Sequence, residues 1–208
     1  MNARRPLVVG LTGSIGMGKT ETARMFARLG IPVHDADAAV HRLYEPGGAA
    51  VAAIAETFPD CVQIDRVNRA QLSARVRDDK AAFTRLESIV HPLVAQEQRA
   101  FIEREAALGA DIVVLDVPLL VETGSHAQVD AVVVVSAPAE IQRARVLQRS
   151  GMTEEMLDQL LERQMPDVDK RAHAHFVVET DKGLRHACEQ VESIVSALRG
   201  RRKQGGNA

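Results

Sequence analysis

The sequence predicts an α/β fold of three layers, in which helices cover both faces of a mostly parallel five-stranded sheet. Strand-like apolar runs alternate with helix-like runs along much of the chain, the order that crossover helices impose on parallel strands. Two runs, Ile112–Leu115 and Val132–Val135, are entirely apolar, which is typical of strands buried on both faces. The expected strands are Leu7–Thr12, Pro32–Asp35, Asp111–Val117, Asp130–Ser136 and Phe176–Glu179.

Two long insertions interrupt this alternation. The first, residues 37–108, shows no convincing strand and is mostly helical, with breaks at Glu45–Gly48 and near Pro59. Within it, His91-Pro92 is expected to form a corner between two helices, with proline at the first helical position. The second insertion, residues 138–174, contains a helix that Thr153 should cap, and it carries several arginines. We therefore expect two helical subdomains attached to the sheet.

The composition is that of an ordinary globular protein. Of the 208 residues, 46% are hydrophobic and 26% charged, and the formal net charge of −2 gives no support to general nucleic-acid binding. No run approaches the roughly 18 apolar residues that a membrane span requires. Cys61 and Cys188 lie far apart and lack metal-site spacing, which favours free thiols in a reducing compartment. A cytoplasmic protein without a membrane or nucleic-acid partner is expected.

The most informative motif directly follows the first expected strand. It has the form G-x-x-x-x-G-K-T and comprises Gly13, Ser14, Ile15, Gly16, Met17, Gly18, Lys19 and Thr20. Glycines let successive N–H groups surround phosphate oxygens, and the following helix N-terminus favours anions. Lys19 should bridge the outer phosphates of ATP, and the Thr20 hydroxyl should bind Mg²⁺. In the empty loop we expect the Lys19 side chain to face solvent.

Acidic residues end two of the expected strands. Asp35-Ala36-Asp37 ends the second strand, and the carboxyl ends of parallel strands face one crevice, so Asp35 should lie near the phosphate loop. There it can orient a hydroxyl, accept its proton or hold Mg²⁺ through water, whereas Asp37 is the better candidate for capping the next helix. Asp116 ends the third strand, the usual position of a Mg²⁺ ligand in phosphate-loop enzymes. The absence of an Asn-Lys-x-Asp motif gives guanine recognition no support.

Taken together, these residues resemble the dephospho-coenzyme A kinase family over nearly the whole chain. The matching segments are Leu11–Thr20, Asp35–Asp37, Glu45–Gly47, Arg69 with Leu72, His91-Pro92, Asp116–Glu122, Gln142–Arg149, Gln164 and Phe176–Val178. The chain departs from the family pattern at Glu179-Thr180, where an Asp-Asn pair is usual, and at His175, which replaces an aspartate.

The resemblance implies a function and a division of the chain. It implies a phosphate-loop kinase that uses ATP and Mg²⁺ to phosphorylate the ribose 3′-hydroxyl of dephospho-coenzyme A. Asp35 matches the catalytic base, and Arg149 matches a lid arginine that reaches the ATP phosphates. The expected acceptor-binding residues are Asp35, Asp37, Arg69, His91, Pro118, Leu119 and Glu122. The expected parts are a nucleotide-binding core (1–36, 109–137 and 175–200), an acceptor insert (37–108), a lid (138–174) and a disordered tail (201–208).

Two other functions are compatible with the motifs. A nucleoside monophosphate kinase would share the phosphate loop and differ in its acceptor. A nucleotide-dependent switch would turn over ATP without responding to any small acceptor. The oligomeric state has no signature in the sequence.

Overall fold

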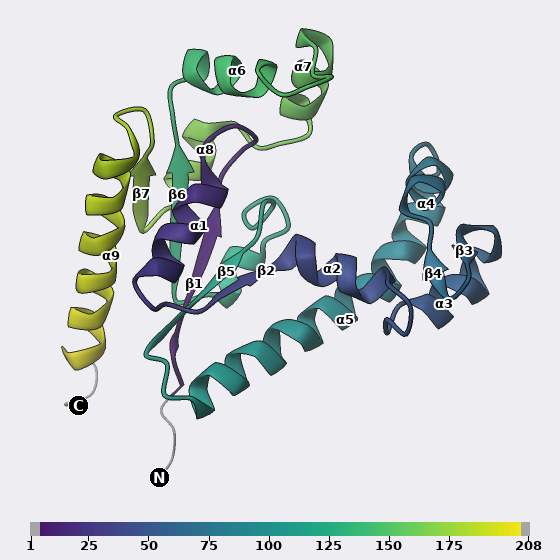
Figure 1. The fold of residues 1–208 in the computed structure, drawn as a ribbon, viewed down its shortest axis with the longest axis horizontal. Helices are drawn as coiled ribbons and strands as arrows, with labels where there is room; N and C mark the ends of the chain where they lie inside the picture. The colour runs from purple at the N-terminus through teal and green to yellow at the C-terminus, as the bar shows by residue number, and fades with distance from the viewer. Residues whose placement is uncertain (1–4, 205–208) are drawn as a thin grey trace. The chain divides into compact units, whose positions relative to one another are not determined.

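The computed structural model describes residues 5–204 and divides into two compact units (Figure 1). The sheet unit contains the chain up to His34 and from Ile102 onward. The helical unit contains Asp35–Phe101. Because each unit has its own hydrophobic core, each is described separately.

Five strands form the central sheet, as predicted. They are β1 (Leu7–Thr12), β2 (Val33–Asp35), β5 (Ile112–Asp116), β6 (Ala131–Ser136) and β7 (Phe176–Glu179), in the order β2-β5-β1-β6-β7. β1 pairs in parallel with β5 and β6, and β6 pairs in parallel with β7. The mostly parallel five-stranded sheet is confirmed, and each of its five strands lies within its predicted range.

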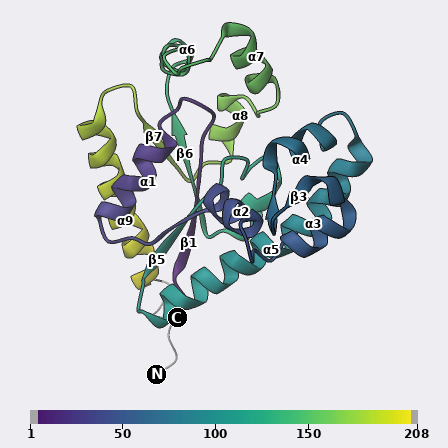
Figure 2. The same cartoon turned by 45° about the vertical axis from the view of Figure 1, so that its right-hand side comes forward.

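The apolar run of β6 is buried on both faces of the sheet. Val133 and Val135 pack into the core formed with α1 (Lys19–Arg28) and α9 (Leu184–Gln204). Val132 and Val134 pack on the other face, against Leu120. Burial of each valine is worth about 2 kcal/mol, which explains why this run contains no polar residue. Figures 1 and 2 both show α1 and α9 side by side on one face.

The C-terminal helix extends further than the sequence predicts. α9 continues to Gln204, so the first half of the expected disordered tail, 201–208, is helical. The guanidinium of Arg201 lies 5.1 Å from the centre of the Phe176 ring, and Arg202 donates to the carbonyl of Arg5 at 3.5 Å. Basic side chains also complement the negative end of the helix dipole. The rest of the predicted tail, 205–208, lies outside the described residues.

Three helices occupy the predicted lid region. They are α6 (Ala139–Leu147), α7 (Glu154–Glu162) and α8 (Asp167–Ala172). Thr153 caps α7 as predicted, because its hydroxyl accepts from the Met156 N–H. Hydrogen bonds to Asp158 and Glu154 of α7 raise the pKa of Arg143 on α6. These bonds join the two helices, which lie beyond the tips of β6 and β7 (Figure 2).

The helical unit contains α2 (Ala36–Tyr44), α3 (Val51–Thr57), α4 (Arg69–Val76) and most of α5 (Lys80–Ala107). Its core contains Leu43, Ile54, Phe58, Leu72 and Val90.

The prediction that this insertion has no strand is wrong. β3 (Val62–Gln63) and β4 (Arg66–Val67) form a small antiparallel hairpin. Its turn residues, Ile64 and Asp65, have φ of 49° and 57°, and the Asp65 carboxylate accepts from the Gly47 N–H. Each strand has two residues and the turn lacks glycine and asparagine, so the usual hairpin signal is missing.

The expected helix–helix corner at His91-Pro92 is also wrong. α5 runs through Pro92 without a break, although proline removes one helical hydrogen bond. Leu86 and Ile89 before Pro92, and Leu93 and Val94 after it, pack against the same core. Packing on both sides of the proline therefore holds one helix where local preference favours two. None of the helices in residues 5–204 is both long and apolar enough to cross a membrane.

Candidate functional site

The phosphate loop, Gly13–Thr20, lies between β1 and α1, the position that its sequence predicts. α1 begins at Lys19, and Gly18 precedes it with a φ of 98°. Thr20 is exposed in the first helical turn. The N-terminus of α1 therefore presents N–H groups and a hydroxyl to any anion bound in the loop.

The loop packs closely against α6. A Cβ atom on Gly16 would lie 2.5 Å from Val146 Cγ2 and 3.0 Å from the Gln142 carbonyl oxygen, and Gly16 has a φ of 79°. No other residue type fits both this contact and this backbone conformation. The start of the predicted lid is thus in direct contact with the phosphate loop.

Lys19 forms an ion pair with Asp116 at the end of β5. The two side chains are 17% and 9% exposed, so the expectation that Lys19 faces solvent is wrong. The sheet register explains the contact, because Asp116 lies opposite Leu11, near the end of the strand that leads into the loop. A largely buried ammonium group needs a carboxylate partner, and Asp116 provides it.

Asp116 and Thr20 fit a magnesium site of the kind that nucleotides complete. Mg²⁺ usually takes one or two protein oxygens and fills its other positions with water and phosphate. Asp116 contacts Lys19, and Thr20 directly follows Lys19 in the chain, so both candidate ligands lie at the same end of the loop. Within residues 5–204 no group of three or more His, Cys, Asp or Glu side chains could hold a metal alone. The donor set therefore suits a metal that arrives with a nucleotide.

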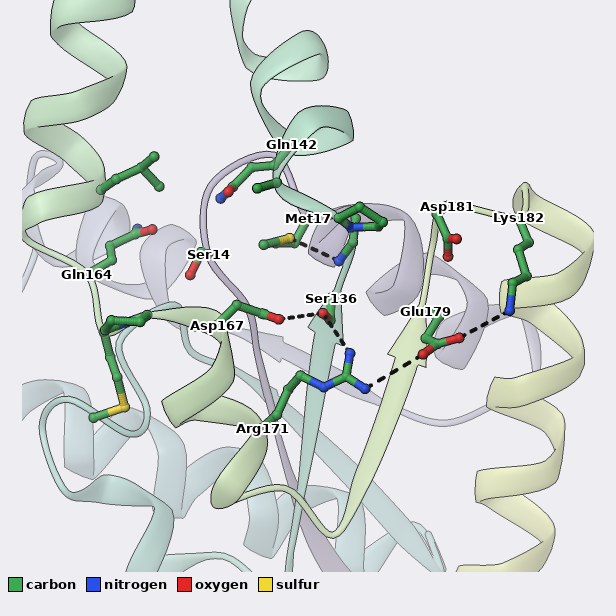
Figure 3. A pocket seen from close by; sticks show the side chains of 16 residues that line it. Ser14, Met17, Ser136, Gln142, Gln164, Asp167, Arg171, Glu179, Asp181 and Lys182 are labelled. Atoms are coloured by element: carbon green, nitrogen blue, oxygen red, sulfur yellow. Dashed lines mark hydrogen bonds and ion pairs between the residues drawn. The ribbon is translucent and has the colours of Figure 1, made fainter.

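A cavity of about 710 Å³ lies beside the loop in the sheet unit (Figure 3). Its lining includes Ser14, Met17, Ser136, Gln142, Gln164 and Lys182. Its volume is within the range of small-molecule sites.

A polar network lies on one side of this cavity. Ser136 Oγ donates to Asp167 at 2.6 Å and accepts from Arg171 at 3.2 Å. Arg171 also pairs with Glu179, which pairs with Lys182 (Figure 3). Our prediction omitted these residues as site members, because they come from separate segments that only the folded sheet brings together.

Glu122, an expected acceptor-binding residue, contacts the end of the lid region. Its Oε1 atom accepts from the Met165 N–H at 3.1 Å and lies 2.9 Å from Lys170 Nζ. The Lys170 side chain is fully buried. A buried ammonium group is costly without a counter-charge, so Glu122 is engaged in structural contacts here.

The arginines of the lid region differ in their surroundings. Arg149 follows α6 and is exposed, and its guanidinium makes no hydrogen bond or ion pair within the described part of the chain. Arg145, by contrast, donates to the hydroxyl and carbonyl oxygens of Thr180, at 2.8 and 2.7 Å. Arg149 is thus available to a ligand, whereas the guanidinium of Arg145 is already hydrogen-bonded to Thr180.

Asp35 caps α2, although Asp37 was the expected cap. Asp35 Oδ1 accepts from the Ala38 N–H at 2.9 Å, and Asp37 lies exposed in the first helical turn. The backbone at Asp35 is extended and already suits a cap, since the strand ends there. The second carboxylate oxygen is not part of this bond.

The other expected acceptor-binding residues are found in both units. In the helical unit, Arg69 is exposed at the start of α4, and His91 lies 3.8 Å from Glu87 on α5. Burial raises the pKa of Tyr44, and the positive charge of Arg69 partly opposes this shift. In the sheet unit, the Pro118 carbonyl accepts from Thr12, and Leu119 is 41% exposed.

Comparison with known proteins decides the family. The sequence model of dephospho-CoA kinase matches residues 7–186. The chain belongs to the dephospho-CoA kinase family. A dephospho-CoA kinase from Mesorhizobium japonicum is 53% identical over 196 residues, which cover 94% of this chain and 98% of that protein. One from Rhodopseudomonas palustris (strain BisB18) is 52% identical over 190 residues, covering 91% and 94%.

Solved structures agree with this family fold. The structure of TT1252 from Thermus thermophilus is 33% identical, with a TM-score of 0.82, and the match covers 93% of this chain and 98% of that one. A dephospho-CoA kinase from Campylobacter jejuni shares the fold at 17% identity, with a TM-score of 0.65 and coverage of 94% and 98%. The sequence-based assignment to the dephospho-CoA kinase family is confirmed.

Proposed function

We propose that this dephospho-CoA kinase transfers the γ-phosphoryl group of ATP to the ribose 3′-hydroxyl of dephospho-CoA, which yields coenzyme A. The observation that carries the proposal is the phosphate loop, in which Lys19 contacts Asp116 and Ser14 and Met17 line a cavity of nucleotide-compatible size. Positioning and charge stabilisation supply most of the catalysis of phosphoryl transfer, and both can come from this loop.

The loop binds the phosphates in this proposal. N–H groups from Gly13 to Thr20 donate to phosphate oxygens, and Lys19 turns from Asp116 to the outer phosphates. The Asp116 carboxylate and the Thr20 hydroxyl are the groups that would hold Mg²⁺. When bound, Mg²⁺ neutralises charge on the β- and γ-phosphates. The existing Lys19–Asp116 pair supports this exchange, because each group keeps a charged partner before and after ATP binds.

Asp35 acts on the acceptor hydroxyl, and Arg149 acts on the ATP phosphates. Asp35 positions the acceptor hydroxyl and takes its proton through the oxygen not used as the α2 cap. Arg149, exposed and without a protein partner among the described residues, contacts the ATP phosphates and helps to exclude water.

We assign acceptor binding to the helical unit, with Asp37, Arg69 and His91, and to Pro118 and Leu119 of the sheet unit. Arg69 is the strongest candidate for the pyrophosphate of dephospho-CoA. A guanidinium can donate two parallel hydrogen bonds to a phosphate, and Arg69 is exposed at a helix N-terminus.

Replacement of Arg69 by alanine should raise the KM for dephospho-CoA by about 10- to 150-fold, since a hydrogen bond to a charged group is worth about 1.5–3 kcal/mol. The KM for ATP should stay within about twofold, as for a residue without nucleotide contact. Arg85→Ala removes an exposed cation from α5 of the same unit and serves as the charge-matched control. A rise in the ATP KM with an unchanged acceptor KM would assign Arg69 to the nucleotide.

Replacement of Arg149 by alanine should lower kcat about 10- to 100-fold, because it removes charge-assisted hydrogen bonds to the phosphates. The ratio of ATP hydrolysis to transfer should increase, since the lid also keeps water from the phosphoryl group. Arg163→Ala, another exposed arginine of the same region, is the control. Normal kinetics in Arg149→Ala would show that Arg149 is a solvent-exposed side chain without a role in catalysis.

An acceptor panel tests the proposed function itself. Purified protein with ATP and Mg²⁺ is offered dephospho-CoA, AMP, CMP or shikimate, and the phosphorylated product is quantified. Product from dephospho-CoA alone supports the proposal, whereas product from AMP or CMP indicates a nucleoside monophosphate kinase. ATP turnover that no acceptor alters would favour a nucleotide-dependent switch. GTP in place of ATP tests the nucleotide preference.

We also propose a cytoplasmic location. Cys61 and Cys188 are both free thiols in the structure, which suits a reducing compartment.

A further inference from the structure

Three successive carbonyl groups of the phosphate loop accept hydrogen bonds from side chains outside the loop. Gln142 Nε2 on α6 donates to the Ile15 carbonyl at 2.7 Å. Arg145, on the same helix, approaches the Gly16 carbonyl at 3.5 Å. Thr180, directly after β7, donates its hydroxyl to the Met17 carbonyl at 2.7 Å.

These bonds determine which way the loop's N–H groups point. In a trans peptide, the carbonyl of one residue and the N–H of the next point in opposite directions. With the Ile15 and Met17 carbonyls held outward, the N–H groups of Gly16 and Gly18 face the other side. Neither N–H has a hydrogen-bond partner within residues 5–204. They are the kind of donor that a phosphate group needs.

Thr180 has a fixed hydroxyl direction. Arg145 Nη1 donates to Thr180 Oγ1 at 2.8 Å, and Arg145 Nη2 donates to the Thr180 carbonyl at 2.7 Å. Since the hydroxyl accepts from Arg145, its one proton is left to donate, and the Met17 carbonyl at 2.7 Å is a much closer acceptor than the Ser136 carbonyl at 3.5 Å. The Thr180 N–H in turn donates to the Ser136 carbonyl at 3.0 Å, which attaches this residue to the end of β6.

We propose that Thr180 is a positioning residue for phosphate binding, because its hydroxyl orients the Met17–Gly18 peptide. Arg145 aligns the Thr180 hydroxyl, and Gln142 orients the Ile15–Gly16 peptide in the same way. The proposal rests on the proposed function only in that the loop binds ATP. It assigns a role to Thr180, which is one of the positions at which the chain departs from the family pattern.

The test compares Thr180→Val with Thr180→Ser. Valine has the shape of threonine without the hydroxyl, so it loses both the bond to the Met17 carbonyl and the bond from Arg145, whereas serine keeps the hydroxyl that makes both. Thr180→Val should weaken binding of MgATP about three- to tenfold, the effect of losing the one hydrogen bond that reaches the loop. Thr180→Ser should recover most of this loss. Equilibrium binding is measured by calorimetry, so the result does not depend on which acceptor the enzyme uses.

Adenosine separates a positioning role from a general structural one. It has no phosphate, so Thr180→Val should leave adenosine affinity unchanged, and the ratio of ATP to adenosine affinity should fall. An equal loss for both ligands, an equal loss in valine and serine variants, or no loss in Thr180→Val would each overturn the proposal.

Gln142→Met provides an independent test of the second peptide, should Thr180→Val fold poorly. It should also lower MgATP affinity about three- to tenfold, whereas Gln148→Met, an exposed position directly after α6, should not. Identical affinities in these two variants would contradict the Gln142 role. Failure of the acceptor panel with these binding results intact would reject the reaction and leave the loop assignment in place.

Discussion

Lys19→Met should lower phosphoryl transfer by at least about 10²–10³-fold, the usual cost of losing one group that stabilises transition-state charge. Methionine keeps most of the length of the side chain and removes its charge. The measurement is kcat with saturating ATP, Mg²⁺ and dephospho-CoA. Near-normal turnover would show that the loop is not the phosphate site.

The Lys19–Asp116 contact requires a stability control, because Asp116 loses its Lys19 partner in this variant. Its side chain is only 9% exposed, so Lys19→Met should also lower the melting temperature. Asp116→Asn in the Lys19→Met background removes the buried negative charge and should restore much of the melting temperature. Activity should stay low in the double variant, which separates the chemical loss from the loss of stability.

Asp35→Asn should lower kcat about 10²–10⁴-fold, the range for a general base, with little change in ATP affinity. The structure makes this substitution more informative than the sequence suggested. Asparagine caps helices as well as aspartate does, so the bond to the Ala38 N–H should persist. A loss of only a few-fold would reduce Asp35 to a helix cap.

Asp79→Asn is the matched control for Asp35→Asn. Asp79 Oδ1 accepts from the Ala82 N–H at 2.8 Å near the start of α5, so the same change is made at another cap of the helical unit. Its kinetics should be normal. A metal titration of Asp35→Asn then separates proton transfer from metal binding, because high Mg²⁺ would rescue only a defect in metal binding.

The strands and the phosphate loop could be predicted because their signals are local and agree with one another. The run Val132–Val135 is continuous because both faces of β6 are buried, and this shows directly in the sequence. The β3–β4 hairpin could not be predicted in this way. Its two-residue strands are too short for a periodicity to appear, and Ile64 adopts a positive φ that isoleucine disfavours.

The candidate site was predictable where residues follow a motif and not where the sheet brings distant segments together. The contact between Lys19 and Asp116 depends on strand register, and Thr180 reaches Met17 from 163 positions away in the sequence. Asp35 was predicted as a functional residue, but its cap geometry depends on where β2 ends and α2 begins. Pro92 shows the opposite error, because a strong local signal was overridden by packing on both sides of it.

The contacts at the two ends of the predicted lid region limit how much of the chain has to move in the proposed closure. At one end, α6 packs on Gly16, and Gln142 bonds to Ile15. At the other end, Met165 and Lys170 contact Glu122. The intervening segment, which carries Arg149 and helix α7, therefore has both ends attached to the rest of the sheet unit. If this segment closes over a nucleotide, as the proposed function requires, the closure costs less conformational entropy than docking a segment attached at one end, and more of the binding energy of ATP is left for catalysis.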